Sequence, residues 1–137
     1  MSSSVWARGA LRDLDLQECI ELLDSKAVGR VAFGTPEGPM ILPVNYAVAR
    51  DCVLFRTTPH NVIAANIGGR TAAFEVDEID DFTQSGWSVL VRGTARFVDS
   101  VDEVPGYVRP ETWAEGVRSL CIAIDLTSVT GRRLLPS

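Results

Sequence analysis

The segment from Gln84 to Val98 alternates between apolar and polar positions over a longer stretch than any other part of this 137-residue chain. Its two faces would carry Trp87, Val89, Val91, Gly93, Ala95 and Phe97 on one side, and Ser88, Leu90, Arg92, Thr94, Arg96 and Val98 on the other. A period of two is typical of a half-buried β-strand and is difficult to obtain from a helix. The segment therefore predicts one long strand, and Gly93 marks a bend or bulge within it.

Shorter segments on either side carry further helix and strand signals. The capping-box spacing of Asp15 and Glu18 predicts a helix that Gly29 stops. Its apolar stripe would consist of Leu16, Ile20, Leu23 and Ala27. The pattern also predicts a short helix at Pro59–Ile67, with Thr58 as a plausible N-cap, and strands at Gly29–Phe33, Pro39–Val48, Cys52–Thr57, Thr71–Asp77 and Arg118–Leu126.

These strands are joined mostly by hairpins and do not alternate one-to-one with helices. That order argues against a parallel nucleotide-binding sheet, and no glycine-rich phosphate motif is present. We therefore predict a mainly β fold, an antiparallel six-stranded barrel with a few short helices.

The length fits a single domain, residues 1–137, in which residues 1–12 would form a flexible or partner-wrapped arm. The first residues lack the apolar region of a secretory signal, and no run of 18 apolar residues could span a membrane. We expect a cytoplasmic protein. Its net charge of −5, from 13 basic and 18 acidic residues, argues against a nucleic-acid partner.

The three cysteines, Cys19, Cys52 and Cys121, lie far apart and include no C-x-x-C pair. A zinc site or any other metal site is therefore not expected. Each lies among apolar residues, so we interpret all three as reduced thiols that pack in the core.

The end of the strand Cys52–Thr57 resembles an anion site. Arg56, Thr57 and Thr58 lead into the predicted helix, whose first free N–H groups would lie near Asn61. A guanidinium fork and hydroxyl groups beside a helix start suit a phosphate. The alternative is an ordinary capped helix with a surface arginine.

A second candidate is the strand around Pro43, because proline cannot donate to a β-ladder and so predicts an edge or a bulge. An unpaired strand edge offers backbone N–H and C=O groups to a flat heterocycle. The adjacent Asn45 adds an amide that both donates and accepts. The alternative is a plain edge strand that proline protects against aggregation.

A third candidate is the beginning of the long strand. Trp87 and Ser88 point to opposite faces, so only one of them serves a given pocket from the same chain. Trp87 could stack on a ring or belong to the core, and Ser88 could meet a ligand. The acidic residues Glu75, Asp77, Glu78, Asp80 and Asp81 are interpreted as a solvated strand end rather than a cation site.

Taken in order, these segments resemble the pyridoxamine 5′-phosphate oxidase-like family of flavin-binding split barrels. The resemblance covers about Leu14 to Val98, with weaker support from Cys121 to Leu134. It is carried by Gly29-Arg30-Val31-Ala32-Phe33, Pro43-Val44-Asn45-Tyr46, Phe55-Arg56-Thr57-Thr58, Phe74-Glu75-Val76-Asp77, Trp87-Ser88-Val89-Leu90-Val91-Arg92-Gly93 and Gly131-Arg132-Arg133.

The resemblance implies an FMN-dependent oxidoreductase that acts on an unknown small molecule, with FMN bound at the interface of a homodimer. The flavin ring would lie along Ile41, Leu42, Pro43, Val44 and Asn45. Its phosphate would be held by Arg56, Thr57, Thr58 and Asn61, and Trp87, Ser88 and Arg132 would lie near the flavin or its substrate. No catalytic residue is assigned.

The sequence departs from the family at the start of the short helix, where many members carry a lysine that binds the flavin phosphate. Val62 occupies that position here. Two other functions therefore stay open: a deazaflavin-dependent reductase, and a non-catalytic module that binds flavin or haem as a carrier or sensor.

Overall fold

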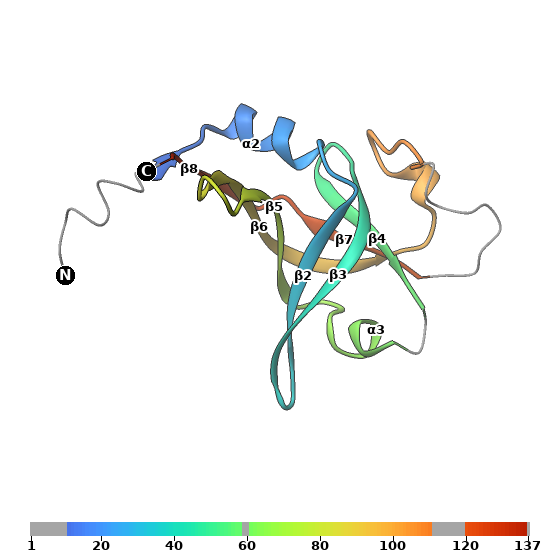
Figure 1. Cartoon of the computed structure of the whole chain (residues 1–137). Helices are drawn as coiled ribbons and strands as arrows, with labels where there is room; N and C mark the ends of the chain where they lie inside the picture. The colour runs from blue at the N-terminus through green and yellow to red at the C-terminus, as the bar shows by residue number, and fades with distance from the viewer. Residues whose placement is uncertain (1–10, 59–60, 111–119, 137) are drawn as a thin grey trace.

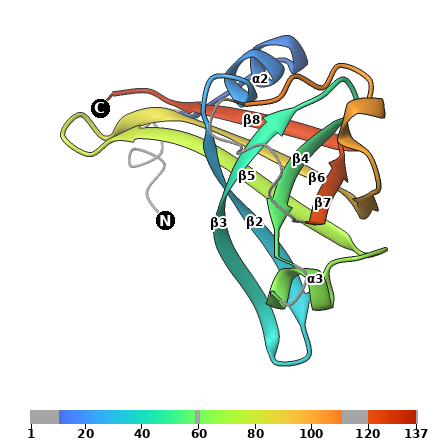
Figure 2. The same cartoon turned by 90° about the vertical axis from the view of Figure 1, so that its right-hand side faces the viewer.

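The computed structural model describes residues 11–58, 61–110 and 120–136. Its strands are β1 (Leu11–Asp13), β2 (Val28–Thr35), β3 (Gly38–Val48), β4 (Cys52–Thr57), β5 (Thr71–Asp80), β6 (Ser85–Val98), β7 (Leu120–Asp125) and β8 (Ser128–Leu134). The helices are α2 (Leu16–Leu23), α3 (Val62–Asn66) and a 3₁₀ turn, η1 (Val101–Glu103). Figures 1 and 2 show α2 and α3 at opposite ends of the barrel.

All pairings among these strands are antiparallel, in the order β1-β8-β6-β5-β2-β3-β4-β7. An additional pairing of β6 with β7 closes the strands β2 to β7 into a barrel. This confirms the predicted mainly β split barrel. Within the described residues, β8 and β1 extend the sheet beyond β6.

The long strand β6 serves two sheets. Its first part, from Gly86 to Arg92, pairs with β8, and its last part, from Ala95 to Val98, pairs with β7. Gly93 lies where the partner changes, at the position where the sequence predicts a bend or bulge. A Cβ atom there would lie 1.8 Å from the Asp125 carbonyl oxygen, so only glycine fits.

The alternation predicted for this strand is confirmed over most of its length. Trp87, Val89, Val91 and Ala95 are buried in the main core, whereas Phe97 is 45% exposed. Phe97 lies near the end of the strand, and its ring packs against Gly68, where a Cβ atom would be 2.6 Å from the ring.

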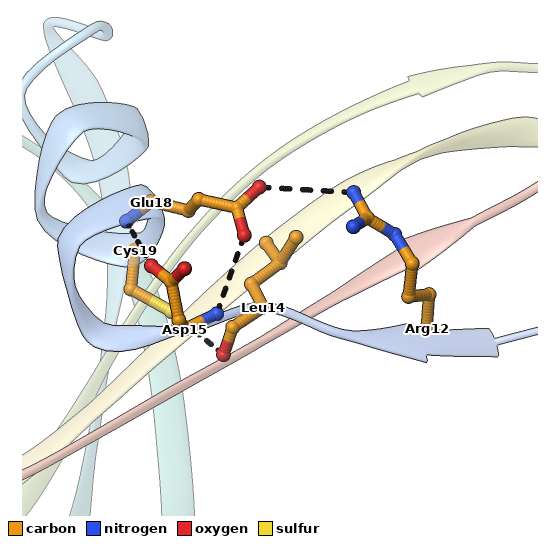
Figure 3. Close-up of polar contacts among 5 residues, drawn as sticks. All are labelled: Arg12, Leu14, Asp15, Glu18 and Cys19. Carbon is orange, nitrogen blue, oxygen red and sulfur yellow. Dashed lines mark hydrogen bonds and ion pairs between the residues drawn. The ribbon is translucent and has the colours of Figure 1, made fainter.

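Helix α2 begins with the predicted capping box. The Glu18 amide donates to the Asp15 carboxylate at 2.8 Å, and the Asp15 amide donates to Glu18 at 3.5 Å (Figure 3). The same Glu18 carboxylate lies 3.7 Å from Arg12, which ties β1 to the helix. The capping residues therefore also join β1 to α2.

The predicted apolar stripe of this helix is only partly right. Leu23 is buried as predicted, but Leu16 is 63% exposed, and Cys19, which the stripe omits, is buried. The helix ends at Leu23, so Ala27 lies outside it. Its buried face rests on Gly131 of β8, where a Cβ atom would be 2.6 Å from the Cys19 sulfur.

Two strands are absent from the sequence prediction. β8 forms from residues interpreted as a tail, and β1 contains Leu11 and Arg12, which the predicted arm had included. Residues 1–10 of that arm lie outside the described residues. No helix in the described part of the chain is long and apolar enough to cross a membrane.

A second, smaller apolar cluster covers part of the outside of the barrel. Ala47, Leu54 and Ala123 face outward from β3, β4 and β7, and the segment after β6 packs over them through Val101, Val104 and Tyr107. This cluster does not cover the outward-facing side chains of β2, β5 and β8.

Candidate functional site

We define the outer face as the outward-pointing residues of five adjacent strands, β3, β2, β5, β6 and β8. The register aligns them in rows, one of which runs Pro43, Arg30, Glu75, Leu90 and Thr130. The face comprises Ile41, Pro43, Asn45, Val28, Arg30, Ala32, Ala73, Glu75, Asp77, Ser88, Leu90, Arg92, Ser128, Thr130 and Arg132, all exposed or half-buried.

The first part of β3 has a free edge. Residues 38–45 pair with β2 on one side, but among the described residues β4 pairs only with Tyr46, Ala47 and Val48. The edge that Pro43 predicts is therefore confirmed. Because β3 and β4 diverge here, backbone polar groups of β3 face outward beside exposed Ile41 and Asn45.

An open groove of about 400 Å³ lies next to this edge on the outer face. Its walls are mostly apolar, and it is lined by Arg30, Ala32, Ile41, Ala73, Glu75, Asp77 and Leu90. Strands β3, β2, β5 and β6 each contribute to it. A flat apolar molecule could pack against the small side chains Ala32 and Ala73. The charged residues Arg30, Glu75 and Asp77 would then lie at one end of it.

Those charged groups form a tight cluster. The Arg30 guanidinium donates from Nε to Glu75 Oε1 at 2.9 Å and lies 2.8 Å from Asp77 Oδ2 through Nη2. Hydrogen bonding to Glu75 raises the pKa of Arg30. Burial, with the neighbouring Asp77 carboxylate, raises the pKa of Glu75 despite the arginine. One cation therefore faces two carboxylates.

The interpretation of this acidic stretch as a solvated strand end is wrong for Glu75 and Asp77. Their side chains are 31% and 33% exposed and both contact Arg30. Asp81, beyond the end of the strand, is exposed as expected. The sequence does not reveal the cluster because Arg30 meets Glu75 only through the β2–β5 register.

The predicted site residues divide between two sides of the sheet. Ile41, Pro43, Asn45, Ser88 and Arg132 lie on the outer face, and Ser88 pairs with Arg132 across β6 and β8. Leu42 and Val44 pack against the barrel core, and Trp87 and Thr57 are buried, 6% and 8% exposed. These four side chains lie on the inner side of the sheet, so the sheet itself separates them from a ligand on the outer face.

Arg56 lies on the outside of the barrel as well. It pairs with Cys121 across β4 and β7 and follows the Tyr46–Phe55 pair, the last one before β3 and β4 diverge. Burial raises the pKa of Cys121 to about 11, and the charge of Arg56 acts in the opposite direction. Asn45 and Arg56 thus flank the point where the free edge begins.

The predicted start of the short helix is wrong. Asn61 is the N-cap of α3 and accepts a hydrogen bond from the Ile63 amide at 2.7 Å, so Thr58 does not cap the helix. Pro59 and His60 lie outside the described residues. Because Asn61 satisfies this first turn with its own side chain, α3 gives little support to an anion site.

Comparison with known proteins identifies the family. A sequence profile described as pyridoxamine 5′-phosphate oxidase matches residues 15–133. The chain belongs to the pyridoxamine 5′-phosphate oxidase family.

Several proteins of known sequence or structure are similar to this chain. An uncharacterised protein of Mycobacterium tuberculosis is 33% identical over 129 residues, which cover 90% of this chain and 85% of that protein. The structure of an FAD binding protein from Mycobacterium smegmatis is 31% identical with a TM-score of 0.71, covering 90% of this chain and 98% of that one. A protein of unknown function from Corynebacterium diphtheriae is 27% identical with a TM-score of 0.73, covering 91% and 98%.

The glycine of the family-like segment Gly131-Arg132-Arg133 has a structural reason in this member of the pyridoxamine 5′-phosphate oxidase family. The Gly131 carbonyl accepts from the Leu14 amide at 3.0 Å, and its missing side chain leaves room for Cys19. With Gly131 fixed beneath α2, β8 holds Arg132 on the outer face. Sequence reasoning assigned this segment to a ligand and missed its packing role.

The residues of the outer face fit part of a flavin. The free β3 edge, the Asn45 amide and the small apolar side chains of the groove suit a flat heterocycle with polar edges. Arg56 and Thr58, at the end of β4, offer a cation and a hydroxyl for a phosphate. Thr57 faces the interior, and Val62 provides no charge, so the phosphate end has fewer donors than the sequence prediction assumed.

Proposed function

We propose that this protein is a flavin-binding oxidoreductase that holds the flavin ring against the free edge of β3 and transfers electrons to or from a small molecule. The observation that carries the proposal is that edge: residues 38–45 lack a partner strand on one side within the described residues, and Ile41 beside it is 65% exposed. Family membership and the FAD binding relative support the same conclusion.

FMN is the flavin that the family resemblance predicts, whereas the relative from Mycobacterium smegmatis is an FAD binding protein. Both cofactors contain the same ring and first phosphate, so both would use the β3 edge and Arg56. FAD adds a second phosphate and a nucleoside, which need further donors. We propose FMN as the cofactor, and a measured preference for FAD would correct this assignment.

A bound flavin supplies the hydride chemistry of the reaction. The protein's own residues would position the ring and keep water away from it. Asn45 can donate to and accept from a heterocycle edge, and Ile41 with Ala32 provides an apolar surface. Ser88 and Arg132, paired across β6 and β8, are available on the same face to orient a polar substrate.

We also propose that the active form is a cytoplasmic homodimer with the outer face at its interface. The face is uncovered by the described residues and mixes apolar side chains with charges of both signs, as interfaces do. The three cysteines are free and buried, which suits a reducing compartment.

The test is a titration of the apo-protein with FMN and with FAD, followed by quenching of flavin fluorescence. We expect saturable micromolar binding, weakened roughly tenfold by Arg56→Ala through loss of a charged hydrogen bond. Arg50→Ala is the matched control, because Arg50 is an exposed arginine at the opposite end of β4. Equal affinities of the two variants would remove the phosphate assignment, and no binding of either flavin would overturn the flavin proposal.

The oxidoreductase part needs its own measurement. The flavin-loaded protein would be photoreduced without oxygen and mixed with artificial electron acceptors, and its absorbance followed. Reoxidation faster than that of free reduced flavin supports an enzyme. Tight binding of both redox states with slower reoxidation than free flavin would instead indicate a carrier or sensor.

A further inference from the structure

The turn between β5 and β6 holds an aromatic side chain out in solvent. Phe82 is 96% exposed. The Asp80 carboxylate accepts from the Phe82 amide at 2.9 Å and from the Thr83 amide at 3.2 Å, and the hydroxyl groups of Thr83 and Ser85 lie 2.6 Å apart. The backbone of the turn is therefore fixed, and Phe82 is presented in advance of any contact, as aromatic anchors of interfaces are.

This turn lies at the end of an arm. Strands β5 and β6 stay paired up to Asp80 and Ser85, and Figure 2 shows their hairpin extending away from the barrel. On the outer face of the arm, Ile79 is 48% exposed and Leu11 is 45% exposed, and both belong to one cross-strand row with Gly86 and Leu134. An apolar row thus leads across the arm beside Phe82.

The same outer face carries a recess of matching chemistry. The wall of the groove formed by Ala32, Ile41 and Ala73 is apolar and open to solvent. Phe82 cannot reach it within one copy, because Phe82 lies in the turn beyond one end of β5 and Ala73 lies near the other end, about 30 Å away at the rise of an extended strand. A second molecule can bring its own Phe82 there.

A twofold axis between two copies can bring the turn that carries Phe82 next to the groove beside Ala73. Asp77 and Ser88 are paired across β5 and β6, and along β6 the distance from Ser88 to Arg92 equals the distance from Ser88 to the turn, about 14 Å each way. An axis that crosses the strands at this row exchanges the turn of one copy with the Ala73–Arg92 row of the other. The contact is then isologous and closed.

Charge complementarity favours the same arrangement. Asp81, next to Phe82, and Arg92 are both exposed, and neither forms an ion pair with any residue that the structure describes. Glu75, which lies diagonally from Arg92, already bonds to Arg30. The axis through Ser88 would set Asp81 of each copy beside Arg92 of the other.

The area of the outer face approaches that of a stable dimer interface. Five strands at a spacing of about 4.8 Å, over roughly 28 Å of strand length, present on the order of 650 Å² per copy. Stable interfaces bury about 800 Å² per partner, and the two projecting turns add to the flat area.

We propose that two copies of this chain pack through their outer faces so that Phe82 of each copy closes the groove of the other, with Asp81 beside the second copy's Arg92. The inference rests on the homodimer of the proposed function and names the residue that each copy contributes to the other's site. The flavin edge of one copy would then be bordered by an aromatic ring from its partner.

Cross-linking tests the contact directly. The double variant Ala73→Cys/Phe82→Cys, treated with a short bis-maleimide, should yield a covalent dimer, because the two positions are too far apart to be linked within one copy. Each single variant and the wild-type protein are controls, since the native thiols are buried. A covalent dimer in the double variant alone supports the proposal.

Sedimentation equilibrium separates this inference from the dimer itself. Phe82→Ser and Arg92→Asp should each weaken the dimer at least tenfold, and Asp81→Arg combined with Arg92→Asp should restore it to within about threefold. Val108→Ser is the control, because Val108 is 78% exposed and lies outside the outer face. A wild-type dimer that is insensitive to these changes and not cross-linked overturns the inference alone. A monomer at micromolar concentration overturns both.

Discussion

A Cβ atom on Gly93 would lie 1.8 Å from the carbonyl oxygen of Asp125, a distance that no side chain tolerates. Asp125 ends β7 and pairs with Cys52, and its carboxylate accepts from Arg96 at 3.1 Å. The close approach of Gly93 and Asp125 is what lets β6 leave β8 and join β7. Closure of the barrel therefore depends on a missing side chain.

Gly93→Ala should destabilise the protein by about 3 kcal/mol or more, since the backbone of β7 must move to admit the methyl group. Urea unfolding followed by circular dichroism measures the change. Gly34→Ala is the control: a Cβ atom there meets nothing within 4 Å, so its free energy of unfolding should stay within about 0.5 kcal/mol of wild type. Equal losses in both variants would contradict the role of the close approach.

Tyr46→Phe should lower the free energy of unfolding by about 1 to 2 kcal/mol. The Tyr46 hydroxyl donates to the Leu23 carbonyl at the end of α2, and its ring packs edge-on against Phe74 with centroids 4.8 Å apart. Phenylalanine keeps the ring contact and loses the hydrogen bond. Burial raises the pKa of Tyr46, so the native hydroxyl should not ionise in an ultraviolet titration to pH 11. An unchanged stability would show that the hydrogen bond contributes nothing.

The thiols should be unreactive in the native protein. All three cysteines are buried, and burial raises the pKa of Cys19, Cys52 and Cys121, to about 11 for Cys121. Ellman's reagent at pH 8 should therefore label none of them within the time in which it labels all three in guanidinium. Rapid labelling of one thiol in the native protein would show that its strand opens locally.

The stability of the protein should carry a component that decreases with rising pH above pH 4.5. Burial raises the pKa of Glu75 above its ordinary value of 4.5, so between these two pKa values the native state binds more protons than the unfolded state. Stability is then greatest below this window and falls as pH rises through the native pKa. Glu75→Gln should remove the component. Glu37→Gln, in the exposed β2–β3 turn, is the control and should keep it.

Features that depend on local pattern could be predicted from the sequence. The faces of β6 follow from strict alternation, and the free edge of β3 follows from the chemistry of Pro43. The same period of two, counted along β3, would have separated outward Ile41, Pro43 and Asn45 from inward Leu42 and Val44. The capping box of Asp15 and Glu18 was equally local.

Features that depend on strand register, or on a choice between competing local signals, could not be predicted from the sequence. Arg30 meets Glu75 and Asp77 across two strands that are distant in sequence, and no local signal marks that contact. Thr58 and Asn61 are both good N-caps, and only the packing of Ile63 in the core decides between them. The sequence of β8 is typical of a polar tail. Its strand forms because it pairs with the first part of β6, Gly86 to Arg92.

Two of the three strands that pair with β6, namely β7 and β8, are the last strands to be made. While β7 and β8 are still missing, β6 has only β5 beside it, and β4 carries an open edge. At 5 to 20 residues per second, a ribosome needs roughly 2 to 7 s to synthesise the chain between the ends of β6 and β8. During this interval the nascent chain exposes two long unpaired edges, which makes it a substrate for chaperones or for aggregation with neighbouring chains. A stop codon in this region would make that transient state permanent.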